Sequence, residues 1–128
     1  MTTEEYLSQV LNLEKRIDTK IEQLKELGPL GEGTNHQIHI DITGIEKLKD
    51  AIYAEINRLV DLKTRIINEL DNIPDNTANT ILAKRYVGGE TWERIAEEIG
   101  YTKRQVHRLH ENALKEFCKI NNLSAENE

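Results

Sequence analysis

The chain has 128 residues, of which 17 are basic and 23 are acidic, so its formal net charge is -6, and 38% of its residues are hydrophobic. This length suits one ordinary domain or a small domain with an attached arm, and the composition favours a helical protein with much charged surface. No stretch approaches the roughly 18 consecutive apolar residues of a membrane span, and the N-terminus lacks the basic-then-apolar order of a signal peptide. We expect a cytoplasmic protein without a membrane partner. The single cysteine, Cys118, cannot form an internal disulfide, which agrees with a reducing compartment.

The first helical pattern covers residues 3–27. Its apolar residues recur every three or four positions and therefore lie on one face of a helix. The segment GPLGEGTN at 28–35 then combines glycines with a proline, which predicts a loop that extends to residue 42. The apolar residues of the first pattern are Tyr6, Val10, Leu13, Ile17, Ile21, Leu24 and Leu27.

A short segment inside this loop, HQIHIDIT, alternates polar and apolar residues and has the pattern of an extended segment. It is too short to form a sheet alone. His36, His39 and Asp41 have the chemistry of metal ligands, but the sequence offers no second ligand cluster for them. We therefore favour a solvated loop here and expect no metal site.

The second helical pattern begins at Thr43, which has the spacing of a capping box with Glu46. Its apolar residues repeat every seven positions over about four heptads, which predicts a coiled-coil-like seam. The obvious partner is the helix at 3–27, so we expect residues 1–73 to form an antiparallel helical hairpin arm. A helix of ~30 residues extends about 45 Å, farther than the first helix, which leaves part of the seam for the C-terminal part of the chain or for a second protomer. We favour self-association into a dimer through this arm. The seam consists of Ile45, Ile52, Leu59, Ile66 and Ile73, with Leu48, Ile56, Leu62 and Leu70 at intermediate positions.

The C-terminal part, residues 74–128, is predicted to be a separate domain. The stretch NIPDNTANT at 72–80 marks the boundary because it combines Pro74 with many short polar side chains. Three helical patterns follow, joined by the short connections GGE and GY, so that neighbouring helices must meet at sharp angles. The three patterns are Thr80 to Val87, Thr91 to Ile99 and Thr102 to about Ile120.

The turn between the last two patterns indicates a helix-turn-helix domain. Gly100 tolerates the positive φ that the end of the first of these helices requires. Thr102 and Gln105 have the spacing of a capping box that starts the second helix. Apolar residues on both helices are expected to pack together beneath the turn: Ile95, Ala96, Ile99, Val106, Ala113, Leu114 and Phe117.

The outward face of the recognition helix, 103–119, then carries the residues that are suited to reading DNA. Most lie in the first two turns, which reach base edges when such a helix enters the major groove. Arginine and lysine donate to guanine, and Gln105 can bond adenine unless the cap holds it. On charge alone, this face would be a solvated surface with three ordinary cations, but the spacing of Gly100, the caps and the apolar residues leads us to favour DNA. The outward-facing residues are Lys103, Arg104, His107, Arg108 and Glu111.

Three further residues are expected to lie near phosphates: Thr91, as the cap of its helix, Trp92 and Thr102. We expect Trp92 to pack under the turn rather than to stack on a base. His107 and His110 have a spacing that would allow a shared metal, but without a carboxylate or thiol beside them we favour packing or phosphate contact. No catalytic constellation stands out, so we expect a protein that is not an enzyme and needs no cofactor.

The acidic charge is distributed unevenly along the chain. Residues 1–83 carry nine basic and fifteen acidic side chains, whereas residues 84–119 carry eight basic and six acidic ones. Because salt screens charges beyond about 8–10 Å, DNA responds to the local field, and a distant acidic arm weakens binding without preventing it. An isolated unit of this kind would bind weakly, which implies help from a dimer or from another DNA-bound protein.

Residues 81–117, ILAKRYVGGETWERIAEEIGYTKRQVHRLHENALKEF, resemble region 4 of bacterial sigma factors, the helix-turn-helix that reads the promoter -35 element. The whole chain is similar to small phage and prophage regulators of Gram-positive bacteria, grouped with late-gene activators of the RinA and ArpU kind. This resemblance implies transcriptional control of phage or mobile-element genes by binding of promoter double-stranded DNA beside host RNA polymerase. The chain lacks the regions that open promoter DNA, so it is not expected to act as a sigma factor by itself. The matching residues are Leu82, Arg85, Tyr86, Gly89, Thr91, Trp92, Ile95, Ala96, Gly100, Tyr101, Gln105, Val106, Arg108, His110, Ala113 and Leu114.

An alternative function of another class stays open. Folds like sigma region 4 also bind protein surfaces, so the chain is alternatively a protein-interaction module that binds host RNA polymerase or a sigma factor without reading DNA. The salt dependence of DNA binding separates the two, because phosphate contacts are lost steeply as salt rises. A hydrolase or metal enzyme is the least favoured class.

Overall fold

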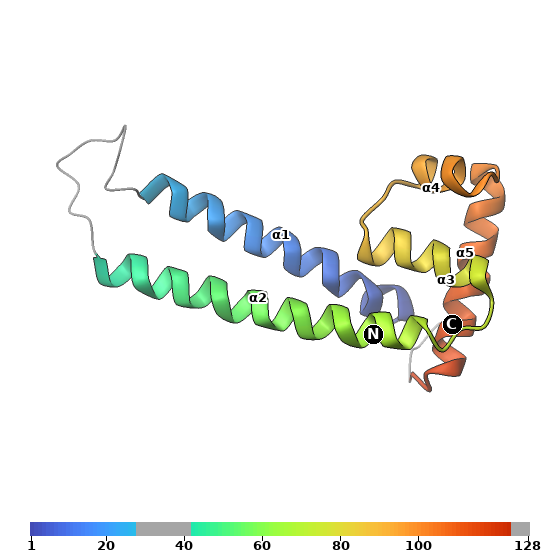
Figure 1. The fold of residues 1–128 in the computed structure, drawn as a ribbon, viewed down its shortest axis with the longest axis horizontal. Coiled ribbons are helices and arrows are strands. Elements are labelled where there is room, and N and C mark those ends of the chain that lie inside the picture. The colour runs from blue at the N-terminus through green and yellow to red at the C-terminus, as the bar shows by residue number, and fades with distance from the viewer. Residues whose placement is uncertain (28–41, 124–128) are drawn as a thin grey trace. The chain divides into compact units, whose positions relative to one another are not determined.

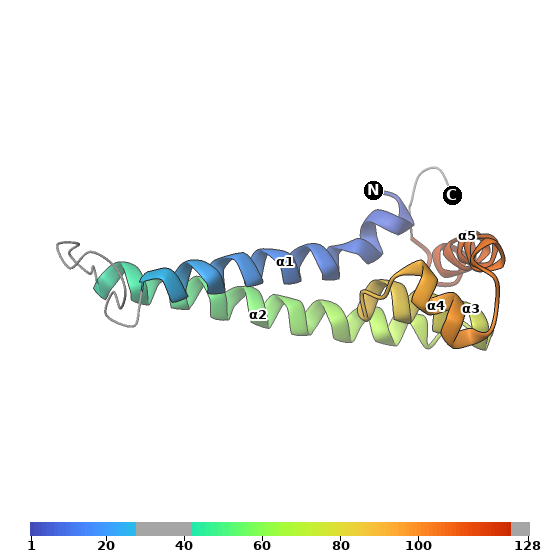
Figure 2. The ribbon, with the colours of Figure 1, turned by 90° about the horizontal axis from the view of Figure 1, so that it is seen from above.

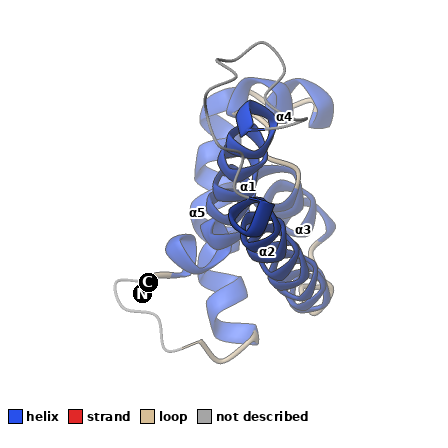
Figure 3. Cartoon of the chain, turned by 90° about the vertical axis from the view of Figure 1, so that its left-hand side faces the viewer, coloured by secondary structure: helices blue, strands red, loops and turns tan. Residues whose placement is uncertain are grey.

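The structure, a computed structural model, describes residues 1–27 and 42–123 of the chain. Every regular element in this part is helical, and it contains no strand (Figures 1 and 3), so the predicted all-α class is confirmed for the described residues. None of these helices has the length and apolar character that crossing a membrane requires. The elements are α1 (Thr3–Leu27), α2 (Ile42–Leu70), α3 (Asn76–Leu82), the π-helical segment η1 (Ala83–Val87), α4 (Trp92–Ile99) and α5 (Lys103–Ile120).

The two long helices follow the apolar periodicity of the sequence. The prediction of a helix over residues 3–27 is confirmed, with α1 ending at Leu27. α2 already includes residue 42, so the prediction that Thr43 caps this helix is wrong. A capping residue has an extended backbone, whereas a residue inside the first turn has helical backbone angles.

The predicted loop at 28–42 lies outside the described residues, apart from the helical residue 42. The candidate metal ligands His36, His39 and Asp41 also lie outside them. The predictions of a loop and of no metal site there therefore stay predictions.

The chain divides into two compact units. One is Asn12–Asp61, and the other joins Met1–Leu11 to Leu62–Glu128. The first turns of α1 and the last turns of α2 thus group with the C-terminal helices. The prediction that residues 74–128 form a separate domain stays a prediction.

In the unit Asn12–Asp61, the segments of α1 and α2 lie side by side (Figures 1 and 2). The carboxylate of the buried Glu55 accepts a hydrogen bond from Lys20 Nζ and lies 3.5 Å from Arg16 Nη2. The hydrogen bond from Lys20 is the main reason why the pKa of Glu55 is lowered. The buried apolar residues of this unit include Leu13, Ile17 and Ile52.

In the other unit, the start of α1 and the end of α2 contact α5. The ring of Tyr6 lies 6.2 Å from that of Phe117, measured between centroids, and its hydroxyl donates to Glu69 Oε1 at 2.6 Å. Asn121, which follows α5, donates from its side chain to the backbone oxygen of Glu69 at 3.3 Å. The buried residues of this unit include Leu7, Val10, Ile66, Leu70 and Phe117.

The first C-terminal helix begins earlier than the sequence predicts. Asp75 caps α3, because its carboxylate accepts hydrogen bonds from the backbone N–H groups of Thr77 at 2.9 Å and Ala78 at 3.3 Å. The predicted start at Thr80 is therefore wrong, since polar residues that resemble a loop form a capped first turn. The chain then continues as η1, where the N–H of Gly88 donates to the carbonyl of Ala83 at 2.9 Å.

A hydrophobic cluster holds α3, α4 and α5 together. It contains buried residues from all three helices, with Trp92, Ile99 and Leu109 packed partly buried against it. The apolar face predicted for the last two helices is confirmed, except that Ile99 is only half-buried. The members of the cluster are Ile81, Ile95, Ala96 and Val106.

Candidate nucleic-acid interface

Local backbone chemistry sets the connection between α4 and α5. The Thr91 side chain caps α4 by accepting from the backbone N–H of Arg94 at 3.2 Å. Gly100 ends α4 in the left-handed conformation, with φ 77°, and α5 starts after only two more residues. The predicted cap at Thr91 and the predicted positive φ at Gly100 are confirmed, and both follow from residue types that suit these backbone positions.

The capping box that starts α5 is present, and it occupies the side chain of Gln105. Thr102 Oγ1 accepts from the Gln105 backbone N–H at 3.1 Å, and Gln105 Oε1 accepts from the Thr102 backbone N–H at 2.9 Å. Reading adenine needs both the oxygen and the nitrogen of a glutamine amide. While the capping box is intact, Gln105 therefore orders the start of α5 and cannot offer a complete amide to a base.

The first two turns of α5 expose the predicted recognition residues. Arg104, His107 and Arg108 are exposed to solvent, and so is Glu111 one turn further along. The same turns bury Val106 in the hydrophobic cluster, which fixes the side of the helix that faces outward. The structure thus brings the predicted cations to one exposed surface.

Lys103 differs from the other cations because it has an acidic partner. Its Nζ lies 2.6 Å from Glu93 Oε2 on α4, and both side chains are more than half exposed. The hydrogen bond from Lys103 lowers the pKa of Glu93. Exposed pairs of this kind contribute little to stability, so Lys103 can exchange Glu93 for a phosphate at small cost.

Trp92 packs inside the α4–α5 unit, as the sequence predicts. Its ring lies 4.6 Å from that of His110 and 4.8 Å from that of His107, measured between centroids. The guanidinium of Arg85 lies over the Trp92 ring, 4.4 Å from its centre, and forms a cation–π pair with it. Arg85 also donates from Nη1 to the carbonyl of Glu90 at 2.9 Å, which ties η1 to the turn before α4.

His110 is a buried structural residue rather than an exposed phosphate ligand. Its Nε2 lies 2.6 Å from the hydroxyl of Tyr86, and each of the two residues is 3% exposed. The Tyr86 hydroxyl also lies 3.3 Å from the Glu4 carboxylate. Burial lowers the pKa of His110 and raises the pKa of Tyr86, so both are neutral near pH 7. The alternative of packing, which the sequence left open for this residue, is therefore the correct one.

A network of charges links η1, the following turn and α4. Lys84 Nζ lies 2.9 Å from Glu98 Oε1 and 3.8 Å from Glu90 Oε2, and Arg94 Nε lies within 3.6 Å of both carboxylates. Hydrogen bonds with Glu90 and with Lys84 lower the pKa of Glu98 to about 2. These cations are already neutralised, so this side of α4 is a poor surface for phosphates.

The sequence did not reveal the contacts of several residues in this region. Glu93 was not singled out, and Arg85 and Tyr86 were named only as matches to sigma region 4, because all three contact residues of other elements, which no local pattern reveals. The exposed Lys115 and Lys119 of α5 have the spacing that continues the line of Arg104 and Arg108, and this signal was available in the sequence.

The structure brings no metal cluster together in the part of the chain that it describes: no group of three or more histidine, cysteine or acidic side chains has a suitable arrangement there. His107 and His110 do not form the core of such a site, because His110 is held by Tyr86.

Comparisons of this chain with protein-family models, with curated proteins and with solved structures found no match.

Proposed function

We propose that the chain is a DNA-binding transcriptional regulator of phage or mobile-element genes, in which α4, its turn and α5 act as a helix-turn-helix. α5 enters the major groove of double-stranded DNA with its N-terminal half. The observation that carries this proposal is the exposed set Arg104, His107 and Arg108 on the first turns of a helix that Thr102 caps and Val106 anchors.

The geometry of α5 supports a role in reading bases. Arg104 and Arg108 are one helical turn apart, so both can point into one groove. A bidentate contact from arginine to guanine contributes about 1–3 kcal/mol of discrimination against another base. His107, between them, offers a further donor or acceptor to a neighbouring base.

The surrounding residues support phosphate binding. Thr91 caps the N-terminus of α4 and Thr102 caps the N-terminus of α5, and such termini bind phosphates through N–H groups. Lys103 contributes once it leaves Glu93. Trp92 supports this surface from beneath, through its contacts with the two histidines.

The long helices contribute a second part of the proposal, in which they form an antiparallel hairpin arm that joins two copies of the chain. Tyr53 and Val60 support this because they are large apolar residues on α2 that are 62% and 55% exposed, seven positions apart. Seven residues span two turns, so both lie on the same side of α2. A dimer would raise the affinity of a single weak DNA-binding unit. The similarity to sigma-region-4-like phage regulators motivates host RNA polymerase as an additional partner.

Fluorescence anisotropy with mixed-sequence duplex DNA at several salt concentrations tests the DNA part. We expect affinity to fall steeply between about 50 and 200 mM salt, because binding releases counterions from phosphates. The double variant Arg104→Ala/Arg108→Ala should bind more weakly. Its charge-matched control, Lys15→Ala/Lys25→Ala, changes exposed residues of α1 and should bind as the natural protein does.

The alternative function predicts a different result. A protein-interaction module would show no salt-dependent DNA binding, and it would instead bind purified RNA polymerase or sigma factor. That pair of results would replace the DNA proposal.

A further inference from the structure

The second half of α5 exposes two lysines, Lys115 and Lys119, beyond the predicted recognition residues. In a helix with 3.6 residues per turn, positions 104, 108, 115 and 119 fall on one side. We call this set the basic stripe of α5: it consists of Arg104, Arg108, Lys115 and Lys119.

Burial on the other side of α5 fixes the direction in which the basic stripe points. Val106, Ala113 and Phe117 are at most 1% exposed and lie in the core. All four residues of the stripe are exposed to solvent. The stripe is therefore the side of α5 that points away from the protein along the full length of the helix.

The length of α5 separates the stripe into two parts. At 1.5 Å per residue, Lys115 lies about 16 Å along the helix axis from Arg104, and Lys119 lies about 22 Å from it. The major groove of B-DNA is only about 12 Å wide and about 8.5 Å deep. When the first turns of α5 place Arg104 and Arg108 at base edges, Lys115 and Lys119 lie farther along the helix by more than the width of the groove, which suits contact with the phosphates that border it.

We propose that Lys115 and Lys119 bind phosphates of the DNA backbone that borders the groove entered by the first turns of α5. This inference rests on the proposed function and extends it, since it assigns the last turns of α5 to backbone binding and the first turns to base reading. Contacts to phosphates hold a protein in register on DNA but carry no sequence information directly.

Glu111 marks the division between the two parts. It is exposed between Arg108 and Lys115 on the same side of the helix. A carboxylate is repelled by phosphates but can accept a hydrogen bond from the amino group of cytosine. Within the basic stripe, phosphate contact is therefore assigned to Lys115 and Lys119, which follow Glu111.

A purely structural role for the lysines makes a different prediction. Lys119 lies in the last turn of α5, where a cation interacts favourably with the helix dipole. If this were its only role, its removal would lower helix stability without changing how DNA binding responds to salt.

The test compares the double variant Lys115→Gln/Lys119→Gln with the natural protein and with Lys15→Gln/Lys25→Gln, which removes two exposed charges from α1. The probe is the duplex that the natural protein enriches from a randomised pool, or mixed-sequence duplex if no motif emerges. We expect the slope of log affinity against log salt to become shallower by about two, one for each lost phosphate contact. The enriched motif should stay the same, and Lys115→Arg/Lys119→Arg should restore the slope.

Two results would overturn the inference while leaving the proposed function standing. One is salt-dependent DNA binding whose slope is the same in the lysine variant and the control. The other is a changed motif in the lysine variant, which would mean that the lysines read bases. A natural protein that shows no salt-dependent binding to either probe would instead refute the proposed function, and the inference with it.

Discussion

At the scale of single residues, the buried contact between Tyr86 and His110 ties the candidate recognition helix to η1. The two polar atoms are 2.6 Å apart, and their side chains are almost fully excluded from water. The hydroxyl has one proton to donate, either to His110 or to Glu4, and the tautomer of the imidazole determines which. A buried polar atom that loses its partner costs more than the hydrogen bond itself contributed.

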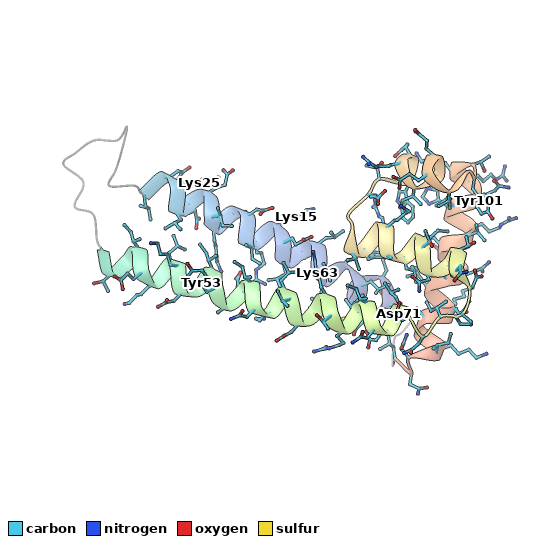
Figure 4. All side chains as sticks on the ribbon, viewed as in Figure 1. Lys15, Lys25, Tyr53, Lys63, Asp71 and Tyr101 are labelled. Carbon is cyan, nitrogen blue, oxygen red and sulfur yellow. The ribbon has the colours of Figure 1, made fainter. Side chains whose placement is uncertain are left out.

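Loss of the Tyr86 hydroxyl should therefore destabilise the protein even when the aromatic ring is kept. We expect Tyr86→Phe to lower the free energy of unfolding by about 1–3 kcal/mol, because it leaves His110 Nε2 buried without a partner. Urea denaturation measures the change. Tyr101→Phe is the matched control, since Tyr101 is 42% exposed (Figure 4). Equal effects of the two substitutions would show that the buried contact is unimportant.

His110 should also make stability depend on pH. Its pKa is lowered in the folded protein because burial disfavours the charged ring, so the unfolded chain, with a pKa of about 6.5, binds the proton more readily. The full contribution of neutral His110 is present above about pH 6.5 and is lost as the pH falls below it. Glu4 and Glu111 oppose this effect by favouring the charged ring, whereas Arg85 and His107 reinforce it.

The expected result is a fall in the free energy of unfolding between about pH 7.5 and pH 5 that is smaller in His110→Gln than in the natural protein. The difference in the free energy of unfolding between the two pH values is compared among the proteins, so that any effect of a substitution that does not depend on pH cancels. His107→Gln removes only one of the groups that act on His110, so it should reduce the pH dependence less than His110→Gln does. A fall of the same size in all three proteins would mean that His110 does not titrate as its burial requires.

At the scale of elements, the turn between α4 and α5 depends on Gly100. Its φ of 77° is one that residues with a Cβ rarely adopt, although a Cβ there would meet no atom within 4 Å. The cost of a substitution is thus confined to the backbone. We expect Gly100→Ala to lower the free energy of unfolding by about 1–2 kcal/mol, and Gly100→Asn to cost less because asparagine tolerates this conformation better. Thermal or urea denaturation distinguishes them, and an alanine variant as stable as the natural protein would contradict the account.

The sequence predicted elements well where local chemistry decides them. The bounds of α1 followed from its apolar spacing, and the start of α5 followed from the pairing of Thr102 with Gln105. The start of α3 was mispredicted, because Asp75 sits in a polar run that looks like a loop unless its capping bonds are known.

The candidate site was predictable only in part. Exposure of Arg104 and Arg108 followed from the helical periodicity, since they alternate with buried positions such as Val106. The pairing of Lys103 with Glu93 and of His110 with Tyr86 could not be predicted, because each joins side chains from different elements at separations that have no fixed pattern.

At the scale of the whole molecule, self-association through the arm is a prediction that concerns the exposed side of α2. Tyr53 (Figure 4) and Val60 lie there, whereas the neighbouring Ile52 is buried and Leu59 is half-buried. The seam predicted from the sequence is thus turned away from solvent at these positions, and a different side of the helix is available to a second copy.

Analytical ultracentrifugation over a range of protein concentrations tests this association. We expect the natural protein to form dimers as its concentration rises and Tyr53→Glu/Val60→Glu to stay monomeric, because charge on this side would oppose burial. The control variant is Glu22→Gln/Gln23→Glu on α1, which keeps the net charge and should leave dimerisation unchanged. Substitutions of Asn57 or Arg58 are not suitable as controls, because these residues lie close to Tyr53 and Val60 on α2. A natural protein that is monomeric at every concentration would refute association through the arm.

The central claim is that this chain reads DNA through the first turns of α5. The most direct measurement is selection of bound fragments from randomised and prophage-derived duplex DNA. It is made with the natural protein and with the α5 variant Lys103→Ala/Arg104→Ala/Arg108→Ala. The charge-matched control is Lys15→Ala/Lys25→Ala/Lys47→Ala, whose positions are all exposed. We predict that the natural protein and the control enrich the same motif and that the α5 variant does not. Enrichment of that motif by the α5 variant, or no enrichment by any of the proteins even at low salt, would contradict the claim.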